Sequence, residues 1–493
     1  MKGFRFALAR QRHEQPRTRR SLAENLASRE KESFSLTDDS PLTLKLTFPM
    51  NTFQITRRGF FKRTAVAAAA TGIPAWFLEQ TLDAADPQKP LLANEKPNIA
   101  LIGCGGRGVG VAKEAAAFGN VVAVCDVDAK RAEKAAQQFP GAKAEKEFRK
   151  VLERGDLHAI INGTPDHWHT FINLAAMKAG KDVYSEKPLT LTVDEGRRIV
   201  KAAQETKRVF QTGSQQRSDA RFRLACELVR NGRIGKLRHV SVVLPAGLHD
   251  GPFPTAPVPP ELDWDRWQGQ ARATEFVPQR AHQTFRYWLD YSGGTMTDWG
   301  AHHHDIALWG MGLDRSGPVS IEGKRLIDPI PGGYDAPSQY RVEYTYADGV
   351  TQTTESTMRN RFDGSIAKEQ AAALPEHGVK FEGSDGWIFV TRGKIQASSQ
   401  ELIDQPLTDK KVELYVSNNH VGNFFDCLRS RQQPICDAEI GHRSASVCHL
   451  GVIAIQLGRK LQWNPTTEQF ETDKEANGHV AREQRKPFTY EMV

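Results

Sequence analysis

The hydrophobic pattern of residues 96–213 switches repeatedly between two periods. Short apolar runs that end in glycine or a polar loop are typical of strands buried on both faces, as in NIALIG, VVAVCD, HAIINGTP, DVYSEKP and RVFQTG. Segments with helical spacing lie between them: VAKEAAAFG, AKRAEKAAQQF, WHTFINLAAMKAGK and TVDEGRRIVKAAQETK. Thr192 and Glu195 have the spacing of a capping box in the last segment. The alternation predicts an α/β fold with a doubly wound parallel sheet over residues 96–213.

The pattern changes in residues 214–493, which we expect to form a second domain. SDARFRLACELVRNG predicts a helix, and SASVCHLGVIAIQLGRKL predicts another that ends near Trp463. QYRVEYTYADG, GVTQTTEST and VKFEGSDGWIFVTRG predict antiparallel strands joined by Asp-Gly turns. The second domain is therefore expected to be α+β, with a largely antiparallel sheet.

The N-terminal 95 residues have the character of an export leader. Residues 1–49 are Arg-rich and lack a pattern, so Met50 is a plausible initiator, the alternative being an unusually long n-region. Residues 50–95 contain Arg57-Arg58 followed by the apolar stretch 65–78, which is too short to span a bilayer. We expect a twin-arginine signal and linker, with export to the periplasm or an equivalent compartment. Ala84-Ala85 is the best candidate for cleavage, and an uncleaved anchor is the alternative.

The distribution of charge argues against nucleic-acid binding, and the cysteine spacing gives no support for a disulfide-stabilised fold. The formal charge is +7, but residues 1–96 hold 16 Lys/Arg against 10 Asp/Glu, while the remaining residues hold 50 against 49. A nucleic-acid-binding domain needs a basic face, and this body is nearly neutral. The six cysteines include no CxxC pair, and nothing in their spacing indicates a disulfide framework.

A glycine-rich turn follows the first strand of the parallel sheet. GCGGRG fits the GxGxxG fingerprint between a strand and a helix, and its candidate cofactor-binding residues are Gly103, Gly105, Gly106, Arg107 and Gly108. The helix N-terminus would face a pyrophosphate with its free amides. Asp126, at the end of the second strand, can accept hydrogen bonds from ribose hydroxyls. These residues predict a Rossmann domain that binds NAD, with NADP kept open by the nearby Arg131.

Two further motifs follow strands at the carboxyl edge of the sheet, where open α/β sheets bind ligands. The first, TPDHWH, supplies Thr164, Pro165, His167 and His169 as candidate cofactor-binding residues and Trp168 as a candidate substrate contact. The second is Glu186-Lys187-Pro188, with Glu186 and Lys187 also facing the cofactor. A lysine there can hydrogen-bond a substrate hydroxyl and assist removal of its proton. A solvated surface charge is the alternative for a lone lysine.

The segment GGTMTDWGAHHHDIALWG supplies a third group of polar residues. If it is helical from Thr297 onward, Asp298, His302 and Asp305 share one face. An aspartate four residues before a histidine can orient the ring and stabilise the imidazolium, which suits an acid/base. The three consecutive histidines point about 100° apart and cannot converge on one metal ion, so we expect no metal site.

GCGGRG, EKP and DWGAHHHD, in this order, resemble the glucose-fructose oxidoreductase/inositol dehydrogenase (Gfo/Idh/MocA) family over about residues 96–490. The resemblance implies that Lys187, Asp298 and His302 line a sugar or polyol site facing the nicotinamide. His302 would exchange the hydroxyl proton, Lys187 would polarise the oxygen, and Asp298 would hold His302. Arg286 and Asp305 are further substrate candidates. The resemblance also implies an open-faced sheet in the second domain and a homo-oligomer, either dimer or tetramer.

Three functions fit these residues. The first is an NAD(P)-dependent oxidoreductase that transfers hydride between a sugar, glycoside or polyol carbon and nicotinamide. The second is an NAD-dependent glycoside hydrolase or lyase that oxidises its substrate transiently. The third is a sugar-binding protein without catalysis, which the joint presence of Lys187, Asp298 and His302 disfavours. Because twin-arginine export moves folded proteins, a cofactor loaded in the cytoplasm could remain bound and be recycled in one site.

Overall fold

The computed structural model of the chain describes residues 44–48, 51–55, 72–74, 76–78, 96–356 and 377–492. Arg57-Arg58, Ala84-Ala85 and most of the predicted leader lie outside the described residues. Within the leader, β1 (Leu44–Phe48) and β2 (Asn51–Ile55) pair as an antiparallel hairpin. No helix in the described ranges is long and apolar enough to cross a membrane.

Residues 98–212 form the predicted parallel sheet, with strand order β5-β4-β3-β6-β7-β8 and every pairing parallel. The fold class is therefore confirmed for this domain. The chain builds one half of the sheet outward from β3 and then returns to build the other half, so the strand order reverses at β3. This reversal opens a crevice at the carboxyl ends of the central strands. The strands are β3 (Asn98–Ile102), β4 (Asn120–Cys125), β5 (Lys143–Glu145), β6 (Ala159–Asn162), β7 (Asp182–Ser185) and β8 (Phe210–Thr212).

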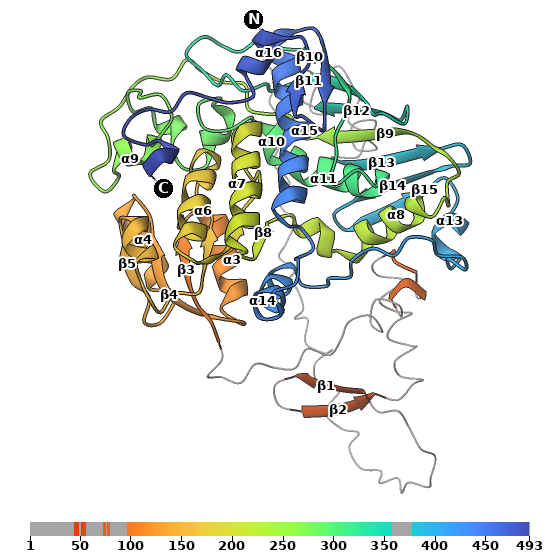
Figure 1. The fold of residues 1–493 in the computed structure, drawn as a ribbon, viewed down its shortest axis with the longest axis horizontal. Coiled ribbons are helices and arrows are strands. Elements are labelled where there is room, and N and C mark those ends of the chain that lie inside the picture. The colour runs from red at the N-terminus through yellow and green to blue at the C-terminus, as the bar shows by residue number, and fades with distance from the viewer. Residues whose placement is uncertain are drawn as a thin grey trace, which may run out of the picture. The chain divides into compact units, whose positions relative to one another are not determined.

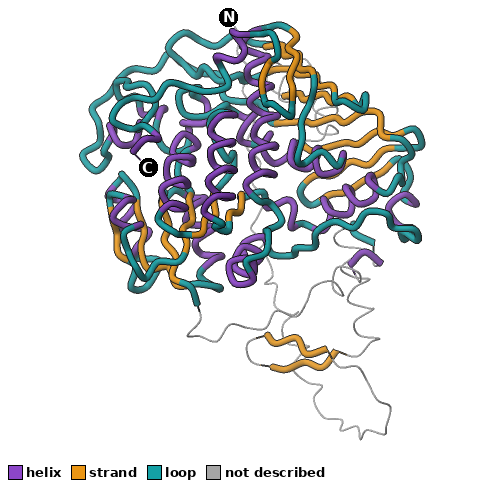
Figure 2. Tube along the Cα trace, in the orientation of Figure 1, coloured by secondary structure: helices purple, strands orange, loops and turns teal. Residues whose placement is uncertain are grey.

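Helices cover this sheet in the tube and ribbon views (Figures 1 and 2). The predicted capping box is present at the start of α7, where the Thr192 hydroxyl accepts from the Glu195 amide and the Glu195 carboxylate accepts from the Thr192 amide. Two orphan amides are thereby satisfied, which fixes where the helix begins. The helices are α3 (Gly106–Ala115), α4 (Ala129–Ala136), α5 (Phe148–Leu152), α6 (Asp166–Lys178) and α7 (Val193–Thr206).

The second domain contains a nine-stranded sheet of order β15-β14-β13-β9-β12-β11-β10-β16-β17. Its pairings are antiparallel except β12 with β9, which confirms a largely antiparallel sheet. Buried and exposed positions alternate along β9 and β11, so one face packs on helices and the other is polar. The strands are β9 (Leu237–Leu244), β10 (Ser320–Arg325), β11 (Tyr340–Thr345), β12 (Thr351–Ser356), β13 (Gly378–Gly383), β14 (Trp387–Thr391), β15 (Lys394–Ala397), β16 (Lys460–Asn464) and β17 (Gln469–Phe470).

The helices of this domain depart from the sequence prediction at one end. The long helix α15 ends at Leu457 because Gly458 takes a left-handed conformation (φ +62°), and residues 460–464 form β16 instead of continuing the helix to Trp463. The helices are α8 (Ala220–Arg230), α9 (Trp264–Gln268), α10 (Thr295–Asp298), α11 (Gly300–Met311), α13 (Glu401–Asp404), α14 (His420–Ser430), α15 (Ala438–Leu457) and α16 (Lys474–Gly478). All six cysteines are buried and unpaired.

The C-terminal chain returns to the nucleotide-binding domain. Phe424 and Phe425 of α14 are buried beside α3 in the same apolar cluster as Leu101 of β3 and Tyr184 of β7. The apolar core beside the parallel sheet is thus completed by residues more than 200 positions later in the chain. A boundary at residue 213 divides the two sheets but not their cores.

Part of the predicted leader packs in the core of the second domain. Ile73 is 4% exposed and Phe77 is 0% exposed, and both belong to the cluster that includes Phe222 and Val390. The Arg223 guanidinium lies 4.2 Å from the centroid of the Phe77 ring. Ile73 and Phe77, which the sequence pattern assigns to an export signal, therefore contribute to this domain in the folded chain.

Candidate active site

Two glycines of the turn between β3 and α3 leave no room for a side chain. Gly103 has φ +91°, and a Cβ there would lie 2.4 Å from the Thr164 amide nitrogen. A Cβ on Gly108 would lie 2.2 Å from the Gly103 carbonyl oxygen. No side chain caps α3, so its first amides remain available to an anion. The turn therefore has the geometry that a dinucleotide pyrophosphate requires.

Asp126 follows β4 and is positioned by two backbone amides. Its Oδ2 accepts from the Cys104 amide at 2.8 Å, and its Oδ1 accepts from the Asp128 amide at 2.9 Å. Burial raises the pKa of Asp126, while these two hydrogen bonds act in the opposite direction. The side chain is thus locked beside the glycine turn, where a ribose would lie. Arg131 lies close by and pairs with Asp128 at 3.6 Å.

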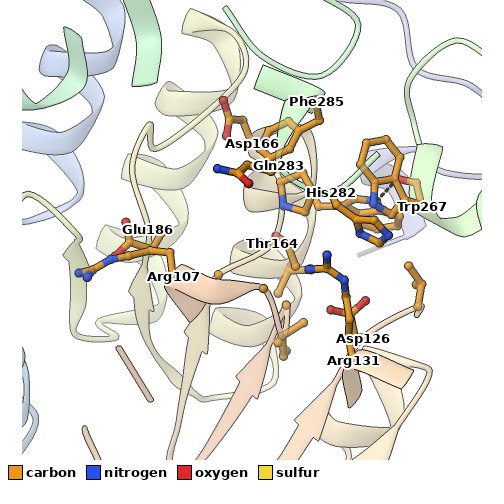
Figure 3. A pocket seen from close by; sticks show the side chains of 18 of the residues that line it. Arg107, Asp126, Arg131, Thr164, Asp166, Glu186, Trp267, His282, Gln283 and Phe285 are labelled. Carbon is orange, nitrogen blue, oxygen red and sulfur yellow. Dashed lines mark hydrogen bonds and ion pairs between the residues drawn. The ribbon is translucent and has the colours of Figure 1, made fainter. Parts of the chain in front are cut away.

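A cavity of about 840 Å³ runs from the glycine turn to the second domain. Figure 3 shows Asp126 and Arg131 side by side at one end, Thr164 in the middle, and Arg107 beside Glu186. The Arg107 Nε donates to Glu186 Oε1 at 2.8 Å, which ties the first helix to the loop after β7. The second domain closes the cavity with a segment of residues 248–291, which contributes Leu248, Arg266, Trp267 and residues 282–287.

Lys187, Asp298 and Arg286 meet on the wall of this cavity. The Lys187 ammonium donates to Asp298 Oδ1 at 2.5 Å, and Arg286 Nε lies 3.4 Å from the same oxygen. Burial raises the pKa of Asp298, but the two cations outweigh it, so this pKa is lowered. The carboxylate is therefore charged at neutral pH and holds the lysine toward the cavity.

The expectation that Asp298 holds His302 is wrong in this structure. The helix is interrupted at Trp299, between α10 and α11, and Asp298 turns to Lys187 while His302 Nδ1 is buried without a hydrogen-bond partner among the described residues. Burial and then the Lys187 charge lower the pKa of His302 well below its usual value. His302 is thus a neutral imidazole, and an imidazolium at this position would be strongly disfavoured.

The expectation that Asp305 contacts substrate is also wrong. Asp305 is 0% exposed, does not line the cavity, and forms a bidentate ion pair with Arg217 at 2.8 and 2.9 Å. The i, i+7 spacing did place it on one helical face, but that face packs against α15, where Ser444 also donates to Asp305.

The two histidines after His302 each have a side-chain partner: His303 pairs with His377, and His304 pairs with Gln352. The described ranges contain no group of three or more His, Cys, Asp or Glu residues that could hold a metal.

The TPDHWH motif divides into cavity-lining and supporting residues. Thr164, Pro165 and Trp168 line the cavity, and the Trp168 indole donates to the Trp267 carbonyl at 2.9 Å. His167 does not reach the cofactor side as expected, because it is fully buried against Trp267 and Tyr291. His169 is buried with its ring nitrogens 2.7 Å from the Pro188 carbonyl and 2.9 Å from the Thr164 carbonyl. His169 therefore joins the two loops that carry Thr164 and Lys187.

Asp166 is a cavity residue within the TPDHWH motif for which the sequence predicted no role. It is the first residue of α6, is 4% exposed, lines the cavity, and accepts from the Ser292 hydroxyl at 2.5 Å. Figure 3 shows it beside Gln283 and Phe285. Its position directly after a strand and a Thr-Pro turn was the available signal. Tyr287 and Trp299 also line the cavity. Trp264 and Trp288 do not line it, but they pack in the aromatic cluster that contains the cavity residues Trp267 and Phe285.

Both domains match descriptions of one protein family. Residues 97–214 match "Oxidoreductase family, NAD-binding Rossmann fold", and residues 248–490 match "Oxidoreductase family, C-terminal alpha/beta domain" of Gfo/Idh/MocA. Together the two matches span most of the chain. The chain belongs to the Gfo/Idh/MocA family. Its Rossmann domain therefore binds NAD, as the glycine turn and Asp126 predict.

Relatives within and around this family share limited identity with the chain. A scyllo-inositol 2-dehydrogenase (NAD⁺) from Bacillus subtilis is 25% identical over 305 residues, covering 62% of this chain and 77% of the relative. A glycosyl hydrolase family 109 protein from Shewanella sp. strain ANA-3 is 29% identical over 205 residues, covering 37% and 44%. Less than half of that relative's length is matched.

Solved structures show the same fold as this family member. The WlbA dehydrogenase from Chromobacterium violaceum, solved with NADH and UDP-GlcNAcA, aligns with TM-score 0.57 at 19% identity, covering 77% of this chain and 99% of that one. A levoglucosan dehydrogenase solved with NADH and levoglucosan aligns with TM-score 0.55 at 16% identity, covering 75% and 99%. At these identities the likeness concerns the fold alone.

Proposed function

We propose that this protein is an oxidoreductase that moves a hydride between a carbinol carbon of a sugar, glycoside or polyol and bound NAD, with NADP as the alternative nucleotide. The carrying observation is the Lys187–Asp298 ion pair on the cavity wall, next to the nucleotide cradle. The names of the inositol and levoglucosan dehydrogenases support a polyhydroxylated substrate. When bound, the nicotinamide accepts the hydride.

The chain's own residues handle the oxygen and its proton. As hydride leaves the carbon of a substrate whose hydroxyl lies against Lys187 Nζ, the hydroxyl proton passes to Lys187 while the ammonium gives one of its own protons to the Asp298 carboxylate. Lys187 thus stays charged and stabilises the new carbonyl oxygen. Arg286, hydrogen-bonded to the Gln283 carbonyl, keeps Asp298 ionised. Because His302 is neutral and buried, we assign it a packing role against Trp299 in place of the acid/base role expected from the sequence.

The enclosing segment, residues 248–291, supports a cofactor that stays bound through many turnovers. It forms an antiparallel bridge between Leu262 and Asp128, and the Lys130 ammonium pairs with Glu261 at 2.6 Å. The Ala129 amide donates to the Glu261 carbonyl, so the segment is fastened beside Asp126. A segment fastened in this way favours retention of the cofactor and its recycling within one site. Mass spectrometry of nucleotide released by denaturing the purified protein tests this: stoichiometric NAD supports retention, and an empty protein contradicts it.

A protein that retains its NAD could also have a second function, which is glycoside cleavage with no net oxidation of the substrate. The partial match to a glycosyl hydrolase family 109 protein favours it. The experiment incubates the NAD-loaded protein with inositols, free sugars and aryl glycosides while reduced nicotinamide and released aryl alcohol are both followed. Net reduction supports the dehydrogenase, and cleavage without net reduction supports the hydrolase or lyase. Binding of sugar without either signal would contradict both and leave a sugar-binding protein.

Export and assembly complete the proposal. Arg57-Arg58 followed by an apolar stretch supports twin-arginine export to the periplasm or an equivalent compartment. Replacing both arginines with lysine should retain the protein in the cytoplasm of an expressing bacterium, as fractionation would show; unchanged export contradicts the route.

The open face of the nine-stranded sheet supports a homo-oligomer, dimer or tetramer. Sedimentation analysis tests that state, and a monomer would contradict it.

A further inference from the structure

The C-terminal tail, residues 480–492, crosses the enclosing segment (residues 248–291) and passes beside the cavity. Residues 480–489 form neither helix nor strand, so side-chain and backbone contacts determine where they lie. In Figure 1 the C-terminus lies beside α9, which belongs to the enclosing segment. The proposed hydride transfer does not use this tail, although one of its residues, Phe488, lines the cavity.

Arg485 fastens the tail to the enclosing segment. Its guanidinium donates to Asp265 Oδ1 at 2.6 Å, to the Asp265 carbonyl at 2.9 Å and to the Gly269 carbonyl at 2.9 Å. The Arg485 amide also donates to the Gln270 carbonyl at 2.9 Å. Three of these hydrogen bonds come from one planar, charged group, whose donors keep a fixed geometry relative to one another. The tail and the enclosing segment are therefore held together closely at this residue.

Tyr490 fastens the other end of the tail to the nucleotide-binding domain. Its hydroxyl donates to Glu195 of α7, the residue that also completes the capping box. The Arg198 guanidinium of the same helix lies 5.0 Å from the centroid of the Tyr490 ring. Because Arg485 contacts the enclosing segment and Tyr490 contacts α7, the tail bridges that segment and the nucleotide-binding domain.

Phe488 lies between these two fastenings and packs on Trp168 of α6. Their ring centroids are 5.8 Å apart and the planes meet at 82°. Trp168 also contacts the enclosing segment, because a Cβ on Gly269 would lie 2.5 Å from the indole. Gly269 has φ +54°, which also favours glycine. The tail, α6 and the enclosing segment thus meet at Trp168.

These aromatic contacts lie on the adenosine side of the cavity. Trp168 packs on Phe148, with ring centroids 6.1 Å apart, and Phe148 begins the helix after β5. In the sheet, β5 lies beyond β4, the strand before Asp126, whereas Lys187 follows β7 on the other side of β3. The adenosine ribose is expected at Asp126. Phe148, Trp168 and Phe488 all line the cavity, and their rings offer apolar surface that fits a purine base.

We propose that the C-terminal tail is a strap that holds the enclosing segment over the adenosine half of NAD and slows release of the nucleotide. The inference rests on the proposed retention of the cofactor. Arg485 and Tyr490 keep the enclosing segment against the nucleotide-binding domain, and Phe488 completes the cavity wall on the adenosine side. Movement of the segment away from the cavity breaks the contacts of Arg485, so these contacts oppose opening.

The rate of NADH release measures the strap. Protein loaded with NADH is mixed with excess ADP-ribose, and the change in nicotinamide fluorescence gives the rate. Arg485→Met should release NADH at least about tenfold faster than the wild type, because three hydrogen bonds from a charged group are lost. Arg459→Met is the matched control: Arg459 also forms ion pairs in the C-terminal region, but its partners Asp473 and Glu475 lie outside the enclosing segment, so release should be unchanged.

The outcomes separate the strap from the retention on which it rests. Release from the wild type as fast as mixing contradicts the proposed retention and the strap together. Slow release that is equal in the wild type and Arg485→Met overturns the strap alone. If Arg485→Met fails to fold, Asp265→Asn provides the test, because the Asp265 side chain is 66% exposed and its loss removes only the ion pair with Arg485. Release should then be about threefold faster, and an unchanged rate overturns the strap.

ADP-ribose binding shows which half of the nucleotide the tail affects. ADP-ribose contains the adenosine half and lacks nicotinamide, so its affinity, measured by calorimetry, reports the end of the cavity that Phe488 lines. Phe488→Ala should weaken ADP-ribose binding at least about fivefold, because apolar contact is lost. Urea unfolding of each variant is compared with its binding. Unchanged affinity for ADP-ribose in a folded Phe488→Ala protein overturns the placement of the strap over the adenosine half.

Discussion

The Lys187 ammonium lies 2.5 Å from Oδ1 of Asp298 and 3.0 Å from the Asp298 backbone oxygen, although 111 residues separate the two in the chain. The pair joins the loop after β7 to the short helix α10 of the other domain. The proposed catalytic cation and its counter-charge thus come from the two domains, so the ion pair forms only when these pack together.

Removing either member of this pair should abolish turnover without releasing the cofactor. Lys187→Met and Asp298→Asn should each lower kcat by at least about 100-fold, because the substrate oxygen loses its polarising group or that group loses its orientation. Reduced-nicotinamide absorbance in single-turnover experiments measures the step, and fluorescence titration checks NAD binding. Lys380→Met, which breaks a pair on the open sheet with Glu382, is the control. Near-normal turnover in either site variant would refute the proposed chemistry.

The Lys187–Asp298 pair also shows which features of the site could be predicted from the sequence and which could not. The glycine turn, the strand ends at Thr164 and Lys187, and the capping box at Thr192 were predictable because each signal is contained in a few consecutive residues. The partner of Asp298 was not predictable, because Trp299 interrupts the helix and Lys187 comes from a distant segment of the chain. Helical spacing put Asp305 on the expected face, but only the packing of α15 decides that this face is core.

Asp305 should therefore affect stability and leave the substrate contacts intact. Asp305→Asn leaves the Arg217 guanidinium, 1% exposed, without its main counter-charge, and we expect a loss of about 3–5 kcal/mol in the free energy of unfolding. Urea denaturation measures it. Asp314→Asn is the matched control, because Asp314 also pairs with Arg217, at 3.3 Å, but is partly exposed and should cost about 1 kcal/mol or less. A large rise in KM with unchanged stability would restore the substrate role.

Asp126 should determine the choice of nucleotide. Its carboxylate is held beside the glycine turn by the Cys104 and Asp128 amides, so a 2′-phosphate would meet a fixed negative charge. We expect NAD to bind at least about tenfold more tightly than NADP, and Asp126→Asn to narrow that ratio by reducing the repulsion. Calorimetry with both nucleotides measures the ratio. Arg131→Met should change it less, and tighter binding of NADP by the wild type would be the contrary result.

The burial of Phe77 predicts that its side chain contributes to the stability of the second domain. The ring is fully buried in the second domain and faces the Arg223 guanidinium, so Phe77→Ala should lower the free energy of unfolding by about 3–5 kcal/mol. Trp76→Ala, at a partly buried neighbour, is the control and should cost less. Denaturant unfolding of the full chain measures both.

The same packing bears on the proposed export: Ile73 and Phe77 should remain part of the folded protein after export. Cleavage after Ala85 would remove Phe77 and Ile73 and open an apolar hollow among Phe222, Val390 and their neighbours, at a cost in stability comparable to the Phe77→Ala change. We therefore expect the exported protein to retain this segment. Intact-mass measurement of protein recovered from the export compartment decides the matter: a mature chain beginning beyond residue 78, with the same unfolding free energy as the full chain, would show that Phe77 is dispensable to the core.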